Sequence, residues 1–106
     1  MEQLEPIKKK SVSVRNEVLK SQSYDVVMHN DDETTMEFVI DILRAIFFKS
    51  DSDAVELMMK VHNEGSAIVA TYKSLDIAQS KVNKAEDLAR ANSFPLSLSV
   101  VAHFDH

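Results

Sequence analysis

The stretch "VVMHNDDETTMEFVIDIL" (residues 26–43) decides the fold. It opens with an apolar run, stops at three adjacent polar residues, Asn30, Asp31 and Asp32, and continues at once with an amphipathic helical pattern. A strand that passes through a polar turn into a helix is typical of an α+β domain. Helix capping and turn formation use one or two such side chains. The others remain free to bind a metal ion or a ligand with N–H groups.

The composition limits the possible classes of protein. With 106 residues, a single domain is expected to bury about 60–70% of its surface. The absence of cysteine excludes disulfides, thiol catalysis and cysteine-based zinc sites. We find no apolar run long enough for a membrane span and no signal-peptide pattern, so we expect a cytoplasmic protein with no membrane partner.

The charge divides the chain into two parts. Residues 1–23 hold five Lys or Arg and three Glu, which gives them a net charge of +2. Because the whole chain has a net charge of −5, residues 24–106 have a net charge of −7. An acidic domain repels phosphate, and we therefore expect no nucleic-acid partner. Residues 1–23 have few large apolar side chains and no sustained period, which predicts a mobile N-terminal extension.

Hydrophobic periodicity predicts strands and helices in the order β-α-α-β-α-β. The inward positions of the first strand are Tyr24, Val26 and Met28, and Thr34, three residues before Glu37, has the spacing of a capping box. The first helix has an apolar stripe of Met36, Val39, Ile40, Leu43 and Phe47. The second helix follows "SDSD", which breaks the first helix and can cap the next; it repeats the spacing with Ala54, Leu57, Met58 and Val61 and stops at Gly65.

A β-branched run, residues 66–72, predicts a buried second strand. The third helix contains Ile77, Val82, Ala85, Leu88 and Ala89 and is closed by Asn92 and Pro95. The last strand alternates through Leu96, Leu98 and Val100. The fold class is therefore α+β, a small three-stranded antiparallel sheet packed against three helices.

Several polar clusters have more than one interpretation. His29, Asp31, Asp32 and Glu33 are possible metal ligands, although helix-cap and turn chemistry explains the same spacing, and we predict no metal and no cofactor. His62 lies at the edge of an apolar stripe, where a histidine is usually a boundary residue. His103 and His106 belong to a short C-terminal tail, and no Ser or Thr has a glycine-rich elbow or phosphate loop. We therefore predict no catalytic residues and no enzyme.

A different chemistry arises if Asn30, Asp31 and His62 converge. A protonated α-amino group has three N–H donors and one positive charge. An amide oxygen, a carboxylate and an unprotonated imidazole nitrogen match these donors. Adjacent Met and aliphatic side chains would then accept the first side chain of the same peptide, because a flexible thioether adapts to varied apolar guests.

Four stretches together resemble the ClpS adaptor family, whose members recognise N-terminal degradation signals and deliver the bearers to an AAA+ unfoldase–protease such as ClpAP. They are "YDVVMHNDDETTMEFVIDIL", "LMMKVHNEGSAIVATY", "DIAQSKV" and "DLARANSFPLSLSV", and they run from Tyr24 to Val100. The resemblance implies the same fold over residues 24–102, followed by a tail at 103–106. It also implies two partners, N-degron peptides and the N-terminal domain of a ClpA-like unfoldase, and a monomer when free.

By position, the resemblance implies that Asn30, Asp31 and His62 hold the α-amino group and that Asp32 supports the peptide backbone or the loop. The pocket for the first side chain would be lined by Thr34, Met36, Val39, Met58, Val61 and Leu96. In the family this pocket prefers Leu, Phe, Tyr and Trp, and the position of Met36 disfavours Ile and Val. Glu33, Asp76 and Lys81 would contact the unfoldase.

Two other functions compete with this interpretation. A general protein-interaction domain resembling the C-terminal domain of the ribosomal stalk protein needs no amine site. A divalent-metal hydrolase built on the acidic loop needs three or four convergent ligands.

Overall fold

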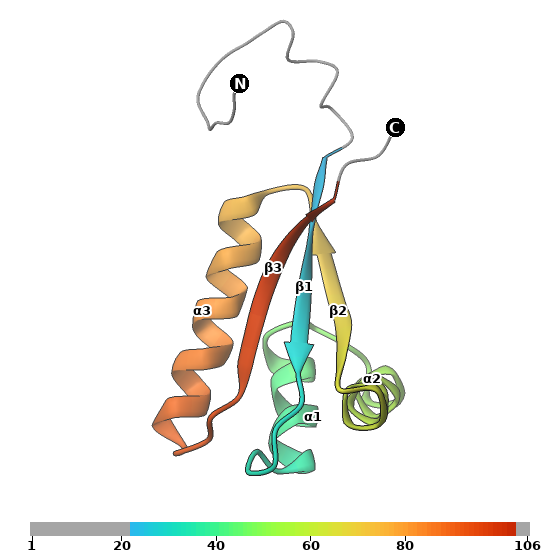
Figure 1. Ribbon diagram of the computed structural model, residues 1–106, viewed down its shortest axis with the longest axis vertical. Coiled ribbons are helices and arrows are strands. Elements are labelled where there is room, and N and C mark those ends of the chain that lie inside the picture. Colours follow the sequence, from blue (N-terminus) through green and yellow to red (C-terminus); the bar gives the residue numbers. More distant parts are fainter. Residues whose placement is uncertain (1–21, 104–106) are drawn as a thin grey trace, which may run out of the picture.

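The computed structural model describes residues 22–103, which form three strands and three helices in the predicted order (Figure 1). The elements are β1 (Ser23–His29), α1 (Met36–Ala45), α2 (Asp51–Glu64), β2 (Ser66–Tyr72), α3 (Leu75–Ala91) and β3 (Ser97–His103). The predicted extension, residues 1–23, lies outside the described residues except for Gln22 and Ser23, and Ser23 is the buried first residue of β1. Of the predicted tail, His103 ends β3 and residues 104–106 lie outside the description.

β1 is the central strand of an antiparallel sheet with the order β2-β1-β3. Met28 pairs with Ala67 on one side and with Leu98 on the other, and all three are buried. Because both neighbours run antiparallel to β1, the end of β1 lies between the start of β2 and the start of β3. This pairing brings three distant segments of the chain to one end of the sheet.

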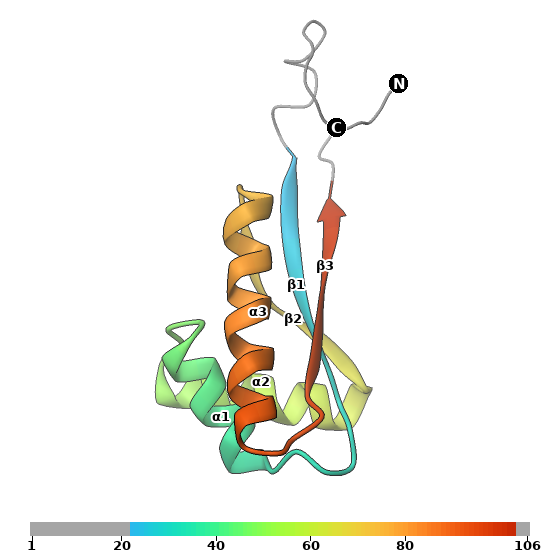
Figure 2. The same ribbon diagram turned by 90° about the vertical axis from the view of Figure 1, so that its left-hand side faces the viewer.

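The helices cover one face of the sheet (Figure 2). α3 lies along the sheet, and α1 and α2 pack near the end at which β1 stops (Figures 1 and 2). The largest fully buried side chains are Met28, Ile42, Leu43, Leu96, Val26 and Val69. Burying one such side chain stabilises the fold by about 1.5–3 kcal/mol. No helix in the part of the chain from 22 to 103 is long and apolar enough to cross a membrane.

The first helix begins one residue later than predicted. The N-cap is Thr35, whose side chain accepts a hydrogen bond of 3.2 Å from the Phe38 N–H. Thr34, the residue predicted to cap the helix, instead gives both its N–H and its hydroxyl to Asp31, each at 2.7 Å. The capping-box prediction was therefore wrong by one position, because the preceding loop already uses the polar groups of Thr34.

The apolar stripe predicted for α1 is correct for Val39 and Leu43 and needs two changes. Met36 is 43% exposed, whereas Ile42, which the stripe left out, is 1% exposed. Phe47 is buried, but α1 ends at Ala45 and Phe47 lies in the turn that follows. The core against α1 is thus wider than a single stripe, because the helix packs against both α2 and other core residues.

The second helix begins and ends as its sequence predicts. Ser50 is the N-cap and accepts from the Asp53 N–H at 3.2 Å. Gly65 is the C-cap in the left-handed conformation, with φ of 90°, and its N–H donates to the Val61 carbonyl. Only glycine adopts this conformation without strain. The chain can therefore turn directly from α2 into β2.

Candidate functional site

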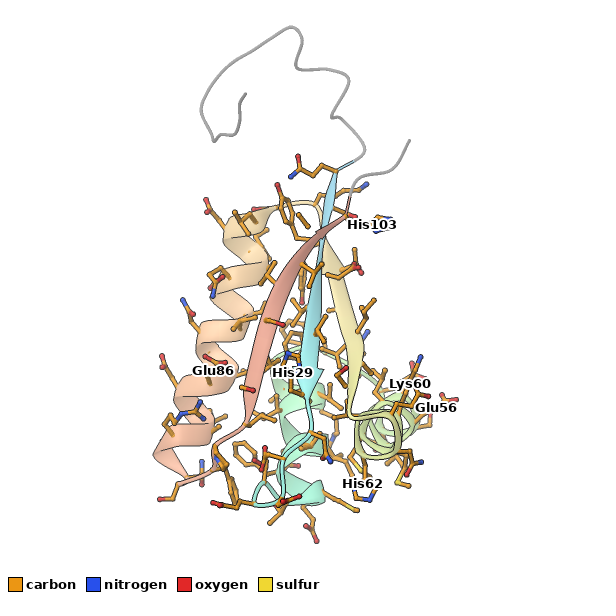
Figure 3. The ribbon with its side chains drawn as sticks, viewed as in Figure 1. His29, Glu56, Lys60, His62, Glu86 and His103 are labelled. Atoms are coloured by element: carbon orange, nitrogen blue, oxygen red, sulfur yellow. The ribbon has the colours of Figure 1, made fainter. Side chains whose placement is uncertain are left out.

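The polar loop after β1 starts beside the last turn of α2. The Asn30 N–H donates to the Gly65 carbonyl at 2.9 Å, one residue beyond the last residue of α2. His62 lies in that last turn and is exposed at the same end of the molecule as the loop (Figure 3). The fold thus places Asn30 and His62, which are 32 positions apart in the chain, at one end of the sheet.

Asp31 is held firmly within this loop. One carboxylate oxygen, Oδ1, accepts from the N–H groups of Glu33 at 2.8 Å and Thr34 at 2.7 Å, and Oδ2 accepts from the Thr34 hydroxyl at 2.7 Å. Burial by itself raises the pKa of Asp31, but hydrogen bonds from Thr34 and Glu33, with the charge of Arg90, lower it overall. A carboxylate has about four acceptor positions. Three are used here, so one position is left for a further donor. The lowered pKa keeps the carboxyl group of Asp31 ionised at neutral pH.

The interpretation of residues 30–32 as a helix cap needs correction. Asp31 bonds to residues of its own loop, and the cap is Thr35. Asn30 and Asp32 are exposed, so their side chains face solvent rather than the first turn of α1. The loop is therefore ordered mainly through one carboxylate, with the polar groups on either side of it accessible.

Four of the six predicted pocket residues belong to the hydrophobic core at this end of the fold. They are Val39, Met58, Val61 and Leu96, with exposed fractions of 8% or less. Met36, in the first turn of α1, is 43% exposed, and Thr34 is half-buried. α1, α2 and the segment before β3 thus supply an apolar base, next to a partly accessible methionine and the ordered acidic loop.

The residues predicted to contact the unfoldase do not form one cluster. Glu33 is in the loop at the lower end of the molecule in Figure 1, whereas Asp76 is in the first turn of α3 at the opposite end. Lys81 is half-buried: its ammonium donates to the Ile46 carbonyl at 3.1 Å and lies 4.4 Å from the centre of the Phe48 ring. This lysine therefore holds the α1–α2 loop, whatever it contacts in a partner.

Sequence reasoning missed the residues at and after the end of α3 that hold Leu96, one of the predicted pocket residues. Nη1 of Arg90 donates to the carbonyls of Phe94 and Leu96, each at 2.8 Å. The Phe94 ring packs against Phe38 of α1, with ring centres 4.9 Å apart. An arginine in the last turn of a helix commonly interacts with the helix dipole. Nothing in the local pattern therefore distinguishes Arg90 from an ordinary helix end.

Within residues 22–103, no three His, Asp or Glu side chains come close enough to share a metal ion. This statement covers the acidic loop and His29. The nitrogen Nε2 of His29 is 2.9 Å from the Ser99 hydroxyl instead.

Comparison with known proteins agrees with this arrangement. A family model described as ATP-dependent Clp protease adaptor protein ClpS matches residues 19–99. The Clp protease adapter protein ClpS of Clostridium acetobutylicum is 40% identical over 90 residues, which are 85% of this chain and 88% of that relative. The corresponding protein of Nautilia profundicola is 42% identical over 80 residues, 76% of this chain and 81% of the relative.

A solved structure, Agrobacterium tumefaciens ClpS2 bound to L-phenylalaninamide, superposes with a TM-score of 0.74 and 36% sequence identity. The match covers 78% of this chain and 99% of the other. Its fold is the one described above. The family model covers most of the sequence, and the matches to relatives cover most of this chain and most of each relative. This chain therefore belongs to the ClpS family of Clp protease adaptor proteins.

Proposed function

We propose that this protein binds the free α-amino group and bulky hydrophobic first residue of N-degron proteins and delivers them to a Clp-type AAA+ unfoldase. The observation that carries the proposal is the Asn30 to Gly65 hydrogen bond. It joins the acidic loop to the helix end that bears His62, above an apolar base. The ligand of the Agrobacterium relative supports it, since L-phenylalaninamide combines a free α-amine with a bulky aromatic side chain.

The amine is held by acceptors on two elements. Asp31 supplies a charge and one acceptor position, while Asn30 and His62 supply an amide oxygen and an imidazole nitrogen. These groups match the three N–H donors of an α-ammonium. Each hydrogen bond to the charged group contributes about 1.5–3 kcal/mol, so an acetylated N-terminus, which lacks both charge and donors, binds poorly. Asp32 supports the peptide backbone or the loop.

The first side chain occupies the apolar base. Burial of a Leu or Phe side chain contributes about 1.5–3 kcal/mol, comparable with one of the charged hydrogen bonds. The base comprises Val39, Met58, Val61 and Leu96, and Met36 and Thr34 form its rim. Because Met36 is partly exposed and flexible, it adapts to guests of different shape. By the family resemblance, its position also disfavours side chains branched at Cβ. Recognition therefore needs a free amine and a large apolar first residue that is not branched at Cβ.

Delivery uses a surface that begins at the acidic loop and continues onto α3. Asp76 and Lys81 lie on α3, and Glu33 lies at the rim of the acidic loop. We propose that these residues contact the N-terminal domain of a ClpA-like unfoldase. With Glu33 and Asp76 at opposite ends of the described fold, that contact extends along α3 rather than forming a compact patch.

A fluorescence-anisotropy titration tests the proposal. The probes are four labelled peptides, beginning with Phe or Leu, each with a free or an acetylated amine. We expect binding of the two free forms, loss on acetylation, and weakening by tenfold or more in Asp31→Asn and His62→Ala, as for one charged hydrogen bond. Asp31→Asn keeps nearly the same shape and removes the charge.

Asp87→Asn is the matched control, because Asp87 is an exposed carboxylate of α3 outside the site. It should bind like the wild type. Equal binding of all four peptides, or none, would contradict amine recognition and would favour a general interaction domain.

A further inference from the structure

We propose that Arg90 is a positioning residue for the pocket of the proposed N-degron site, because its guanidinium holds the backbone that carries Leu96. The inference rests on the proposed function and assigns a role to a residue outside the predicted site. Two sets of contacts of the described residues carry it, and the positive charge of Arg90 adds to them.

The first contact fixes the segment between α3 and β3. Ser93 adopts a left-handed conformation, with φ of 64°, and the Phe94 N–H donates back to the Ala89 carbonyl at 2.8 Å. A single nitrogen of Arg90 then bonds to the carbonyls of Phe94 and Leu96. Pro95 lies between them and has no N–H of its own to offer. The guanidinium therefore sets the orientation of the backbone that carries Leu96, a side chain only 1% exposed.

The second contact comes from the helical turn before Arg90. The carboxylate of Glu86 accepts a hydrogen bond of 2.9 Å from the Leu98 N–H, and Glu86 lies on the side of α3 that faces β3 (Figure 3). Glu86 and Arg90 are four residues apart and so share one face of the helix. α3 thus holds the backbone around the start of β3 through two side chains. Glu86 accepts from the Leu98 N–H, and Arg90 donates to the carbonyls of Phe94 and Leu96.

The positive charge of Arg90 also favours the ionised form of Asp31. Burial of Asp31 raises the pKa of its carboxyl, the hydrogen bonds from Thr34 and Glu33 lower it, and the charge of Arg90 lowers it further. Removal of this charge should therefore add a small electrostatic effect to the loss of the two hydrogen bonds to Phe94 and Leu96.

Charge and hydrogen bonding can be separated by substitution. Arg90→Met keeps the aliphatic stem and removes the charge and the donors. Arg90→Lys keeps the charge but offers a point cation in place of the planar fork. Arg44→Met is the matched control: Arg44 is also in the last turn of a helix, α1, and is paired with Asp41 and Asp51.

The experiment is the anisotropy titration with free-amine peptides beginning with Phe, Leu and Trp, at low and high salt, beside thermal melting. We expect Arg90→Met to bind the Phe peptide about tenfold more weakly, as after loss of a hydrogen bond to a charged group. We expect Arg90→Lys to recover affinity to within about threefold, as for an exposed charge interaction, with an altered ratio among the three peptides. The difference between wild type and Arg90→Met should shrink at high salt.

Several results would overturn the inference. If Arg90→Met binds within twofold of wild type and its selectivity is unchanged, Arg90 is an ordinary helix-end residue. A loss equal to that of Arg44→Met has the same meaning. If Arg90→Met does not fold, Arg90→Lys is the deciding variant. The positioning role is refuted if Arg90→Lys equals wild type both in affinity and in the ratio of affinities among the three peptides. A wild type that binds no peptide refutes the proposed function itself.

Discussion

At the scale of single residues, Asp31 has one observed role and one proposed role. Its carboxylate orders the loop through three hydrogen bonds and, in the proposed function, keeps an acceptor for the incoming amine. The two roles require the same ionised state. Because hydrogen bonds within the loop already fix the carboxylate of Asp31, an amine bound there would meet a preformed acceptor. A preformed acceptor reduces the entropy lost on binding.

Asp31 should make the stability of the fold depend on acidity. Its pKa is lowered below the ordinary value of 3.8, so the folded state binds a proton less readily than the unfolded state. The resulting stabilisation is present above pH 3.8 and is lost as the pH falls through the lower, folded pKa. Thermal melting should show Asp31→Asn less stable than wild type at pH 7, with the difference shrinking at pH 3. A constant difference would contradict this role, and Asp87→Asn controls for net charge.

At the scale of helices and strands, two adjacent threonines between β1 and α1 make different contacts. Thr34 closes the loop on Asp31, and Thr35 caps the helix. The two threonines therefore contribute to different properties, even though they are adjacent and identical in type.

Substitution of each threonine should separate these properties. Thr35→Ala removes the N-cap and should lower the free energy of unfolding by about 0.5–2 kcal/mol, with little change in peptide affinity. Thr34→Val keeps the shape, removes the hydroxyl that bonds to Asp31, and should weaken peptide binding more than Thr35→Ala does. Urea unfolding and anisotropy measure the two effects. The reverse pattern would show that Thr34 is the functional cap.

Gly65 connects α2 to β2 in a conformation that other residues resist. A Cβ added there meets no atom within 4 Å, so the cost of a side chain comes from the backbone and not from a clash. Gly65→Ala should destabilise the fold by about 1–2 kcal/mol, and Gly65→Asn by less, since asparagine tolerates the left-handed region. Chemical denaturation of both variants measures this difference. Equal losses would indicate that the strain is not conformational.

At the scale of the whole molecule, the sheet order determines the site. Because β1 lies between antiparallel neighbours, its end meets the starts of β2 and β3. The polar loop, the C-terminal end of α2 and the segment before β3 therefore converge. The core beneath them is continuous with the proposed pocket base, so pocket residues also contribute to stability.

Two isoleucines test this description of the core. Ile42 is 1% exposed and Ile77 is 50% exposed, although the sequence pattern named Ile77 for its helix and left Ile42 out of the apolar stripe of α1. Ile42→Ala should cost about 2–5 kcal/mol of unfolding free energy, while Ile77→Ala should stay within about 0.5 kcal/mol of wild type. Calorimetry or urea unfolding compares them. Similar losses would mean that α3 packs differently from the described fold.

The amino-acid sequence by itself determined the order of the elements, the capping of α2 by the segment "SDSD" and the left-handed stop at Gly65. These features depend on periodicity and on side chains acting within a few residues, which a sequence displays directly. The family resemblance supplied the proposed site residues. The shift of the first cap from Thr34 to Thr35 shows the limit of reasoning from local spacing. Sequence could not tell which threonine Asp31 would engage.

Only the tertiary structure decided the convergence of Asn30 with the helix end bearing His62, the burial of Ile42, and the support of Leu96 by Arg90. Each depends on contacts between segments far apart in the chain, or on which side of a helix its neighbours lie. Local pattern carries no information about such distances. They are set when antiparallel pairing fixes the register of three strands and the helices pack against the face that results.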